Sequence, residues 1–478
     1  MNLYFQLLTD EELQRIHDGS LAVLERTGMK LESEHMLAAL RRQGAAVDTA
    51  AGTARFPPSL VEGAIASTRE LLRAGRKMHL LNGVTSGLTE GGRIQAKLSG
   101  GCERYLDWES MCVQEADAAS LLRFIRLGEM LPDVDFVGNP VVLRSDENGR
   151  PIEERMRRIH TAALVAKNTR KLGSMEVWSE REIDFLVEMG TIARGSREEF
   201  ERRPCFLTAK ETVSPLFLDG NAAAILLALA RRGLPCTIIP MPLSGLSSPV
   251  TKLGNALMAN AEVLGVITAV RAVHPEALVG GGSISGTLDM ATGVVSFSSP
   301  EAILQDIAVA EVHERLYGFD YLIGTGYTDA RYPNPQVLAE KLLKFLFSFL
   351  SRRCSYPVGL LEAGAVFSDL QALVDLELCR YIHAHFGGFG DTASVPQLVE
   401  LIAEVGIRGS FLSEEHTLAH FRENWFPGIF DRGTGPGNIY DRARGRLREL
   451  YGRADFWELD GSASREIDAV VRCAERAL

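Results

Sequence analysis

Short apolar or β-branched runs alternate with longer segments of helical period from about residue 134 onward. Eight runs predict strands, at 134–141, 170–178, 204–214, 236–242, 277–285, 321–328, 357–366 and 406–412. Apolar residues three and four apart predict the helices that follow them, at 151–168, 180–194, 218–232, 251–273, 300–317, 335–352, 369–386 and 414–423. Eight strand–helix units with right-handed connections predict an α/β fold of the (β/α)8, or TIM barrel, type.

A doubly wound open sheet is the alternative to the barrel. Such a sheet usually carries a Gly-x-Gly-x-x-Gly turn after its first strand, and none follows 134–141. The glycine-rich run 280–286 has another spacing and no helix begins within it, which is typical of a strand in a tight barrel interior.

The two ends of the chain follow other patterns. Helices are predicted at 10–28, with Thr9 as cap and Gly28 as stop, at 33–44, and from Pro57-Pro58 to 65. Residues 77–98 are glycine-rich and polar, and suggest irregular strands. We therefore expect 1–6 to be most of a cleavable tag, 7–130 an extension packed on the barrel, 131–430 the barrel, and 431–478 a helical tail.

Composition excludes several classes of protein. Lys and Arg number 51 against 62 Asp and Glu, a formal net charge of −11, which argues against a nucleic-acid-binding protein. No apolar run reaches the ~20 residues of a membrane span, and no basic run suggests a membrane surface. Seven scattered cysteines are typical of reduced thiols in the cytoplasm. The N-terminal helices and the tail offer faces for a homo-oligomer, without indicating the number of subunits.

Active sites of such barrels lie at the carboxyl ends of the strands. This rule selects residues by position alone: Asn139, Glu176, Trp178, Glu211, Thr212, Met241, Pro242, Ser283, Ser285, Tyr327, Asp329, Glu362 and His416. Motifs of a serine hydrolase, a zinc protease or a phosphate-binding loop are absent from the sequence.

A zinc site and a glycosidase are two other functions that these residues could suggest. His416 and His420 have the spacing of a zinc pair on one helix, but no third ligand is identifiable. We therefore predict no metal site in this chain. Paired glutamates also occur in glycosidases, but Trp178 is the one tryptophan predicted at a strand end, whereas sugar sites usually carry several.

Several segments, in a shared order, resemble the trimethylamine methyltransferase superfamily. They are Leu8–His17, Val23–Gly28, Ser244–Gly254, Asn260–Leu264, Asp289–Gly293, Ser299–Glu301, Gly326–Arg331 and Phe411–Arg422. The resemblance implies a TIM barrel that moves a methyl group from a methylated amine to a reduced corrinoid (cobalamin) on a separate corrinoid protein. Founding members use pyrrolysine, whereas this sequence contains standard residues only. It therefore resembles the branch without pyrrolysine, whose known substrates include glycine betaine, carnitine and proline betaine.

The chemistry of a quaternary amine fits a chain without acid–base motifs. Its nitrogen already carries the positive charge, so a neutral tertiary amine leaves and no proton is delivered. The enzyme has to hold the cation and align one N–CH3 bond with cobalt, and such positioning can contribute up to ~7–11 kcal/mol. We expect glycine betaine as the substrate. A different methylated amine, or a betaine-binding barrel without transferase activity, are the alternatives.

The resemblance and the chemistry together suggest substrate-binding residues, but no certain catalytic residue. Quaternary ammonium binds aromatic faces, so the candidates for a cage are Tyr105, Tyr327, Phe386 and Phe389. The candidate donors to a betaine carboxylate are His160, Arg331 and His416. Glu211 is the candidate to offset the cation's charge. Ordinary packing, or for Arg331 a surface position, is the alternative for each of them.

Overall fold

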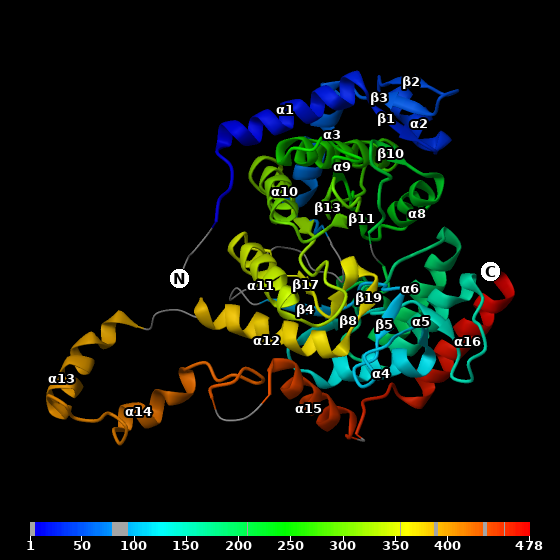
Figure 1. The fold of residues 1–478 in the computed structure, drawn as a ribbon. Coiled ribbons are helices and arrows are strands. Elements are labelled where there is room, and N and C mark those ends of the chain that lie inside the picture. The colour runs from blue at the N-terminus through cyan, green and yellow to red at the C-terminus, as the bar shows by residue number, and fades with distance from the viewer. Residues whose placement is uncertain are drawn as a thin grey trace.

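The computed structural model describes residues 5–78, 94–207, 209–353, 355–386, 391–433, 437–453 and 455–478, and shows a mixed α/β fold (Figure 1). The helices are α1 (Asp10–Arg26), α2 (Glu34–Arg42), α3 (Pro58–Arg73), α4 (Ala118–Met130), α5 (Glu154–Asn168), α6 (Ile183–Arg194), α7 (Arg197–Arg202), α8 (Gly220–Arg231), α9 (Lys252–Val273), α10 (Pro300–Glu311), α11 (Pro335–Leu350), α12 (Asp369–His385), α13 (Val395–Val405), α14 (Glu415–His420), α15 (Ile439–Tyr451) and α16 (Gly461–Ala477). The strands are β1 (Met29–Leu31), β2 (Ala46–Asp48), β3 (Thr53–Arg55), β4 (Gln95–Leu98), β5 (Arg104–Leu106), β6 (Val113–Gln114), β7 (Ala116–Asp117), β8 (Val134–Val137), β9 (Leu143–Ser145), β10 (Phe217–Leu218), β11 (Cys236–Ile238), β12 (Leu243–Ser244), β13 (Val279–Ser283), β14 (Gly286–Leu288), β15 (Val295–Ser296), β16 (Tyr321–Ile323), β17 (Ser355–Pro357), β18 (Leu360–Leu361) and β19 (Val366–Phe367).

Parallel strands form two groups at the centre of the molecule. One group has the order β17–β4–β8 and the other β11–β13–β16. Two further segments connect them on one side. Val137 pairs with Leu172, the Phe206 amide donates to Gly173 O (3.0 Å), and Lys210 pairs with Ile238. The backbone of the second segment is left-handed at Phe206 (φ 62°). On the other side the Thr325 hydroxyl donates to Ser355 O (2.9 Å), which joins the end of β16 to β17.

The prediction of an eighth strand at 406–412 is wrong. These residues are turns and coil, with Ile407 98% exposed, and the backbone is left-handed at Gly406 (φ 69°) and Arg408 (φ 64°). Left-handed residues interrupt the extended backbone that strand pairing requires. The remaining parallel strand is instead β4, which pairs with both β8 and β17, so the expected boundary at residue 130 divides one sheet. Its short polar sequence, Gln-Ala-Lys-Leu, lacks a strong strand pattern.

The structure confirms the predicted helices, most of them to within a few residues, whereas α3, predicted to end at 65, continues to Arg73. Thr9 caps α1, as predicted, and its side chain and that of Glu12 exchange hydrogen bonds with each other's backbone amides. Gly28 follows with φ 77° and lies directly against the Ala54 carbonyl, where a side chain would collide. The predicted helix 300–317 is continued past α10 by a π-helical segment, Val312–Tyr317.

Helix α9 is the central helix of the core. Among the described residues it is the one helix long and apolar enough, by length and composition, to cross a membrane, but most of that stretch is buried inside the protein. Helices α1, α2 and α3 pack on it (Figure 1). Asn260 of α9 donates to Ser20 Oγ (2.8 Å) and to Tyr317 Oη (3.1 Å), so the N-terminal helices are bonded to the body.

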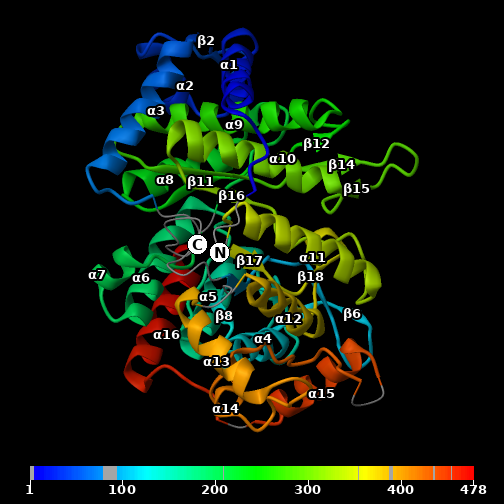
Figure 2. The ribbon, with the colours of Figure 1, turned by 90° about the vertical axis from the view of Figure 1, so that its left-hand side faces the viewer.

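The C-terminal helices cover the opposite side of the molecule. Helix α16 packs along α5 and α6, and α15 packs on α12 and α4 (Figure 2). Helices α13 and α14 differ from all of these, since they lie outside the body and contain no buried residue (Figure 1).

Candidate functional site

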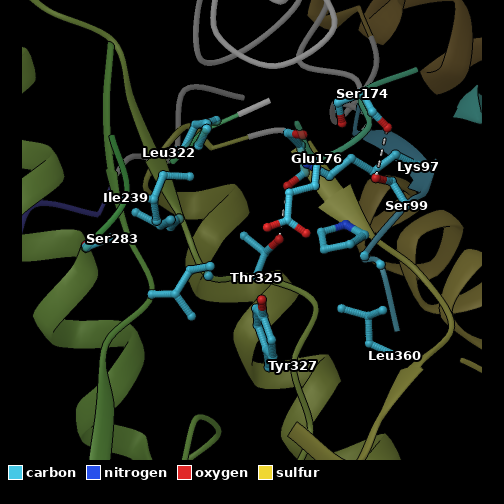
Figure 3. Close-up of a pocket in the computed structure, with 18 of the residues that line it drawn as sticks. Lys97, Ser99, Ser174, Glu176, Ile239, Ser283, Leu322, Thr325, Tyr327 and Leu360 are labelled. Carbon is cyan, nitrogen blue, oxygen red and sulfur yellow. Dashed lines mark hydrogen bonds between the residues drawn. The ribbon is translucent and has the colours of Figure 1, made fainter. Parts of the chain in front are cut away.

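A pocket of about 200 Å³ lies between the two groups of parallel strands (Figure 3). That volume is far above the ~10–15 Å³ that one water molecule needs. Five residues selected by their position at strand ends line it, namely Asn139, Glu176, Glu211, Ser283 and Tyr327. Side chains that follow neighbouring parallel strands therefore meet at one place, as the rule for such sheets predicts.

Two glutamates present carboxylates to this pocket, with cations behind them. Lys210 Nζ lies 3.6 Å from Glu176 Oε1 and 3.6 Å from Glu211 Oε2. The side chains of Glu176 and Glu211 are 37% and 42% exposed, whereas that of Lys210 is 9% exposed. Lys97 and Arg353, both buried, also line the pocket. A ligand therefore meets two exposed carboxylates in a wall that also contains cationic side chains.

Arg158 supports this arrangement from helix α5. Its guanidinium lies 3.4 Å from Glu176 Oε2 and stacks on the Trp178 ring, 3.6 Å from the ring centroid. Burial lowers the Arg158 pKa to about 10, which still leaves the group charged at neutral pH. Trp178, a candidate by position, thus serves to hold Arg158 and does not line the pocket.

The protonation of Glu211 is perturbed by its surroundings. Burial is the main cause and raises the pKa of this carboxyl, and the nearby Glu176 charge raises it further. Lys210 opposes both effects. A bound cation beside Glu211 would act in the same direction as Lys210 and favour the ionised form.

Tyr327 brings an aromatic ring into the pocket after β16. Its hydroxyl points toward Thr325 and the interior (Figure 3). The ring packs beside Phe297, at 5.6 Å between centroids, and burial raises the pKa of the hydroxyl. Gly364 lies against the ring edge with φ 88°, a conformation suited to glycine, so a larger residue there would displace Tyr327.

Asp306 of α10 fixes two of the strand ends beneath the pocket. Its carboxylate accepts from Ser283 Oγ (2.7 Å), the Ser285 amide (2.9 Å) and the Gly324 amide (3.2 Å). Burial raises the Asp306 pKa to about 6. The residue orders the ends of β13 and β16, and with them the Ser283 side of the pocket.

Asn139 is a buried amide in the pocket wall. The residue is 2% exposed, and its Nδ2 has no hydrogen-bond partner among the described residues. Leaving such a donor unpaired costs about 1–3 kcal/mol. This is the feature expected of a group that completes its hydrogen bonding when a ligand binds.

The structure does not bring the predicted aromatic cage together. Tyr105 lies on β5, where its ring packs on Phe124 (5.3 Å) and its hydroxyl donates to Gln114 Oε1 (2.8 Å). Phe386 packs on Phe349 at the end of α12. Phe389 lies outside the described residues. Of the three candidates among the described residues, Tyr327 is the one that lies in the pocket, where the buried Tyr321 joins it.

The predicted carboxylate donors also lie elsewhere. His160 faces a separate groove between α5 and α16, and burial lowers its pKa. Arg331 is 76% exposed and pairs with Glu362 (3.3 Å). His416 is exposed on α14, because the strand expected before it does not form. Sequence spacing indicated residues near strand ends but not the direction of their side chains.

Lys210 and Arg158, which contact the two pocket glutamates, are among the residues that sequence reasoning missed, as are the lining residues Lys97, Tyr321 and Arg353. Lys210 immediately precedes Glu211 in the predicted strand 204–214. A basic residue next to a candidate carboxylate could therefore have indicated Lys210 from the sequence. Arg158 lies on a helix, remote in sequence from Glu176, and only packing could place it there. The described residues contain no group of three or more His, Cys, Asp or Glu side chains that could hold a metal ion.

Comparison with known proteins gives the family. The family model described as trimethylamine methyltransferase (MTTB) matches residues 2–474. Trimethylamine methyltransferase MttB of Desulfitobacterium hafniense (strain DSM 10664 / DCB-2) is 30% identical over 429 residues, 89% of this chain and 83% of that protein. The MttB of Methanosarcina barkeri (strain Fusaro / DSM 804) is 27% identical over 98% of this chain and 95% of its own length.

Two further similarities complete the comparison. The glycine betaine methyltransferase of Desulfitobacterium hafniense (strain Y51) is 24% identical over 90% of this chain and 87% of that protein. The crystal structure of the Methanosarcina barkeri monomethylamine methyltransferase (MtmB) aligns with a TM-score of 0.44 and 14% identity, over 93% of this chain and 95% of that chain. Since the family model spans nearly the whole sequence, the chain belongs to the trimethylamine methyltransferase (MTTB) family of methyltransferases.

Proposed function

We propose that this protein transfers a methyl group from a quaternary amine, glycine betaine, to the cobalt of a separate corrinoid protein. The observation that carries the proposal is the pocket in which Glu176 and Glu211 expose carboxylates beside Tyr327, with Lys210 and Arg158 buried behind them. A permanent organic cation suits such a surface, because it gains attraction without needing a hydrogen bond.

We infer that the two strand groups are parts of one (β/α)8 barrel. Its eight strands would be β4, β8, the segment 171–175, the described residues of 205–210 (205–207 and 209–210), β11, β13, β16 and β17. In support, parallel pairings join β17, β4, β8 and Leu172, and likewise join Lys210, β11, β13 and β16. Single hydrogen bonds, from Phe206 to Gly173 and from Thr325 to Ser355, connect the two groups. Each strand is followed by a helix as far as α12. The barrel would then begin near Gln95, with the N-terminal helices and the tail packed outside it.

The reaction needs little from the protein beyond position. The C–N bond breaks and leaves its electron pair on nitrogen, so a neutral tertiary amine departs and no proton moves. The corrinoid, a second substrate held by its own protein, supplies the electron pair of the new bond. This chain's residues would orient the cation: Glu176 and Glu211 hold the charge, and Tyr327 limits where the methyl groups lie.

Asn139 would give the site its preference for a betaine. A ligand carboxylate would accept a hydrogen bond from its Nδ2, which has no partner among the described residues. Trimethylamine carries no carboxylate and would leave that donor unpaired. The standard residues of this chain support the same choice, because a quaternary amine needs no unusual residue to become a methyl donor.

A spectroscopic assay tests the function directly. The purified chain is mixed with a corrinoid protein reduced to the cobalt(I) state and with glycine betaine, and the corrinoid absorbance is followed. We expect methylation that requires both the chain and the betaine. Transfer from trimethylamine but from none of glycine betaine, carnitine and proline betaine would overturn the quaternary-amine proposal. Tight betaine binding in calorimetry without any transfer would instead favour a binding protein.

The proposal assigns the protein to the cytoplasm. Its partners there would be the small amine and the corrinoid protein, with no nucleic acid or membrane. The six cysteines among the described residues are free thiols, which the reducing cytoplasm maintains.

A further inference from the structure

Glu362, which its position at a strand end selected from the sequence, lies in an unusual turn between β18 and β19. Three successive residues of this turn, Glu362 (φ 47°), Ala363 (φ 54°) and Gly364 (φ 88°), have left-handed backbone. Among the described residues, Glu362 and Ala363 are the one pair of successive non-glycine residues with positive φ. Such conformations are rare for residues with a β-carbon, and they persist where the surrounding contacts hold them. The turn must therefore be fixed by its neighbours.

Backbone hydrogen bonds connect this turn to the loop that follows β16. The Ala363 amide donates to Thr328 O (2.7 Å), and the Glu362 amide donates to Ala330 O (2.9 Å). On its side chain, Glu362 Oε2 lies 3.4 Å from Arg104 Nη2. Both backbone bonds end within three residues of Tyr327, so the turn and the aromatic ring of the pocket are held together.

The turn meets the pocket at the ring of Tyr327. A β-carbon on Gly364 would lie 2.7 Å from Tyr327 Cε1, far inside the ~3.5–4.0 Å of a normal carbon–carbon contact. The Phe297 ring and the Lys344 ammonium also pack on this ring, both 5.6 Å from its centroid. Tyr327 lines the pocket, but none of the three turn residues does. The turn therefore acts on the pocket through this ring.

We propose that the turn Glu362–Gly364 is a positioning element, which fixes the Tyr327 ring against the ammonium group of the substrate. This inference rests on the proposed function, because it takes the ring as a contact of a bound quaternary amine. The attraction between a cation and a ring requires the cation to lie over the ring face. A ring that the turn blocks at one edge keeps this geometry, whereas a ring that moves freely loses it. Strained backbone of this kind is found at ligand clamps.

NMR of the Tyr327 ring tests the contact without any substrate. The 10 tyrosines of the full chain are labelled with carbon-13 at Cζ, and Tyr327→Phe identifies the Tyr327 signal. We expect Gly364→Ala to shift that signal, because the added methyl group collides with the ring. Gly195→Ala is the matched control, since Gly195 is also left-handed (φ 85°) but a β-carbon there would meet no atom within 4 Å. It should leave the Tyr327 signal unchanged.

A double-variant cycle measured by calorimetry tests the role in binding. Gly364→Ala should weaken glycine betaine binding about 2- to 30-fold, the range expected for loss of a cation–ring contact. Tyr327→Leu lacks the atom that the new methyl group meets, so in that background Gly364→Ala should change the affinity by less than about twofold. Equal weakening in both backgrounds would show an effect that does not pass through the ring, and would overturn the proposal. Gly195→Ala should bind betaine as the wild type does.

Ala363→Gly adds no atom and keeps the proposal testable if Gly364→Ala does not fold. Glycine adopts a φ of 54° without strain, so we expect the melting temperature to rise by about 1–2 °C. The looser turn should broaden the Tyr327 signal and weaken betaine binding about twofold, because stability and a rigid site are opposed here. An unchanged signal together with unchanged affinity in this variant would overturn the proposal.

The NMR and binding measurements separate this inference from the proposed function. A wild-type chain that does not bind glycine betaine, but whose Tyr327 signal shifts in Gly364→Ala, would refute the proposed substrate and still support the positioning of the ring. A Tyr327 signal that Gly364→Ala leaves in place would overturn the positioning, whatever the chain binds.

Discussion

Replacing Glu211 with Gln removes one carboxylate charge from the pocket and keeps the size of the side chain. A trimethylammonium nitrogen about 5 Å from this carboxylate, at an effective dielectric constant of about 20, is attracted by about 3 kcal/mol. Lys210 lies 3.6 Å from the same carboxylate and opposes this attraction, so we expect a net contribution of about 1–2 kcal/mol. The variant should therefore bind glycine betaine about 5- to 30-fold more weakly.

Isothermal titration calorimetry with glycine betaine measures this difference. Glu198→Gln, on the exposed surface of α7, is the matched control and should bind as the wild type does. Because burial raises the Glu211 pKa, protonation at falling pH should weaken binding to the wild type. The Glu211→Gln variant should lack that part of the pH dependence.

The melting temperature of Glu211→Gln shows whether a loss of betaine binding is caused by unfolding. A raised carboxyl pKa means that the folded protein disfavours the charged form, so the neutral glutamine should not lower the melting temperature. Betaine affinity within twofold of the wild type, in a variant that is fully folded, would refute the assignment of Glu211 as a cation-binding residue.

Three further changes test other parts of the structure. Tyr327→Leu should weaken betaine binding about 2- to 30-fold in calorimetry. Tyr327→Phe keeps the ring and should retain most of the affinity. An equal loss of affinity in both variants would exclude the ring as the contact. Lys341→Met leaves the fully buried Asp375 without its 2.6 Å partner and should lower the urea-measured free energy of unfolding by about 3–5 kcal/mol, and adding Asp375→Leu should restore most of it. Asp306 binds its proton more tightly when folded, with a pKa of about 6 against 3.8, so its contribution to stability should fall by on the order of 3 kcal/mol as pH rises from about 4 to 6. Asp306→Asn should lack this slope in denaturation at stepped pH, and identical profiles would contradict it.

The sequence by itself determined the helices that follow the predicted strands and most of the strand order, but not α4, α7 or α13. Periodicity acts locally, so the capping of α1 by Thr9 and the alternation of strands and helices could be read from neighbouring residues. Position at strand ends likewise selected Asn139, Glu176, Glu211 and Tyr327, because parallel strands bring their carboxyl ends together. Motif order was sufficient to predict the family.

Only the tertiary structure decided which of these side chains share a pocket. The Arg158 stack on Trp178 joins a helix to a strand end, and no periodicity encodes such a contact. Tyr105 and His416 carry the right chemistry but face other surroundings, since a side chain's direction depends on the packing of its element. Irregular strands were expected over 77–98, but the sequence did not show that Gln95–Leu98 belongs to the central parallel sheet. Its four residues have a weak local preference, and the pairings with β8 and β17 stabilise it.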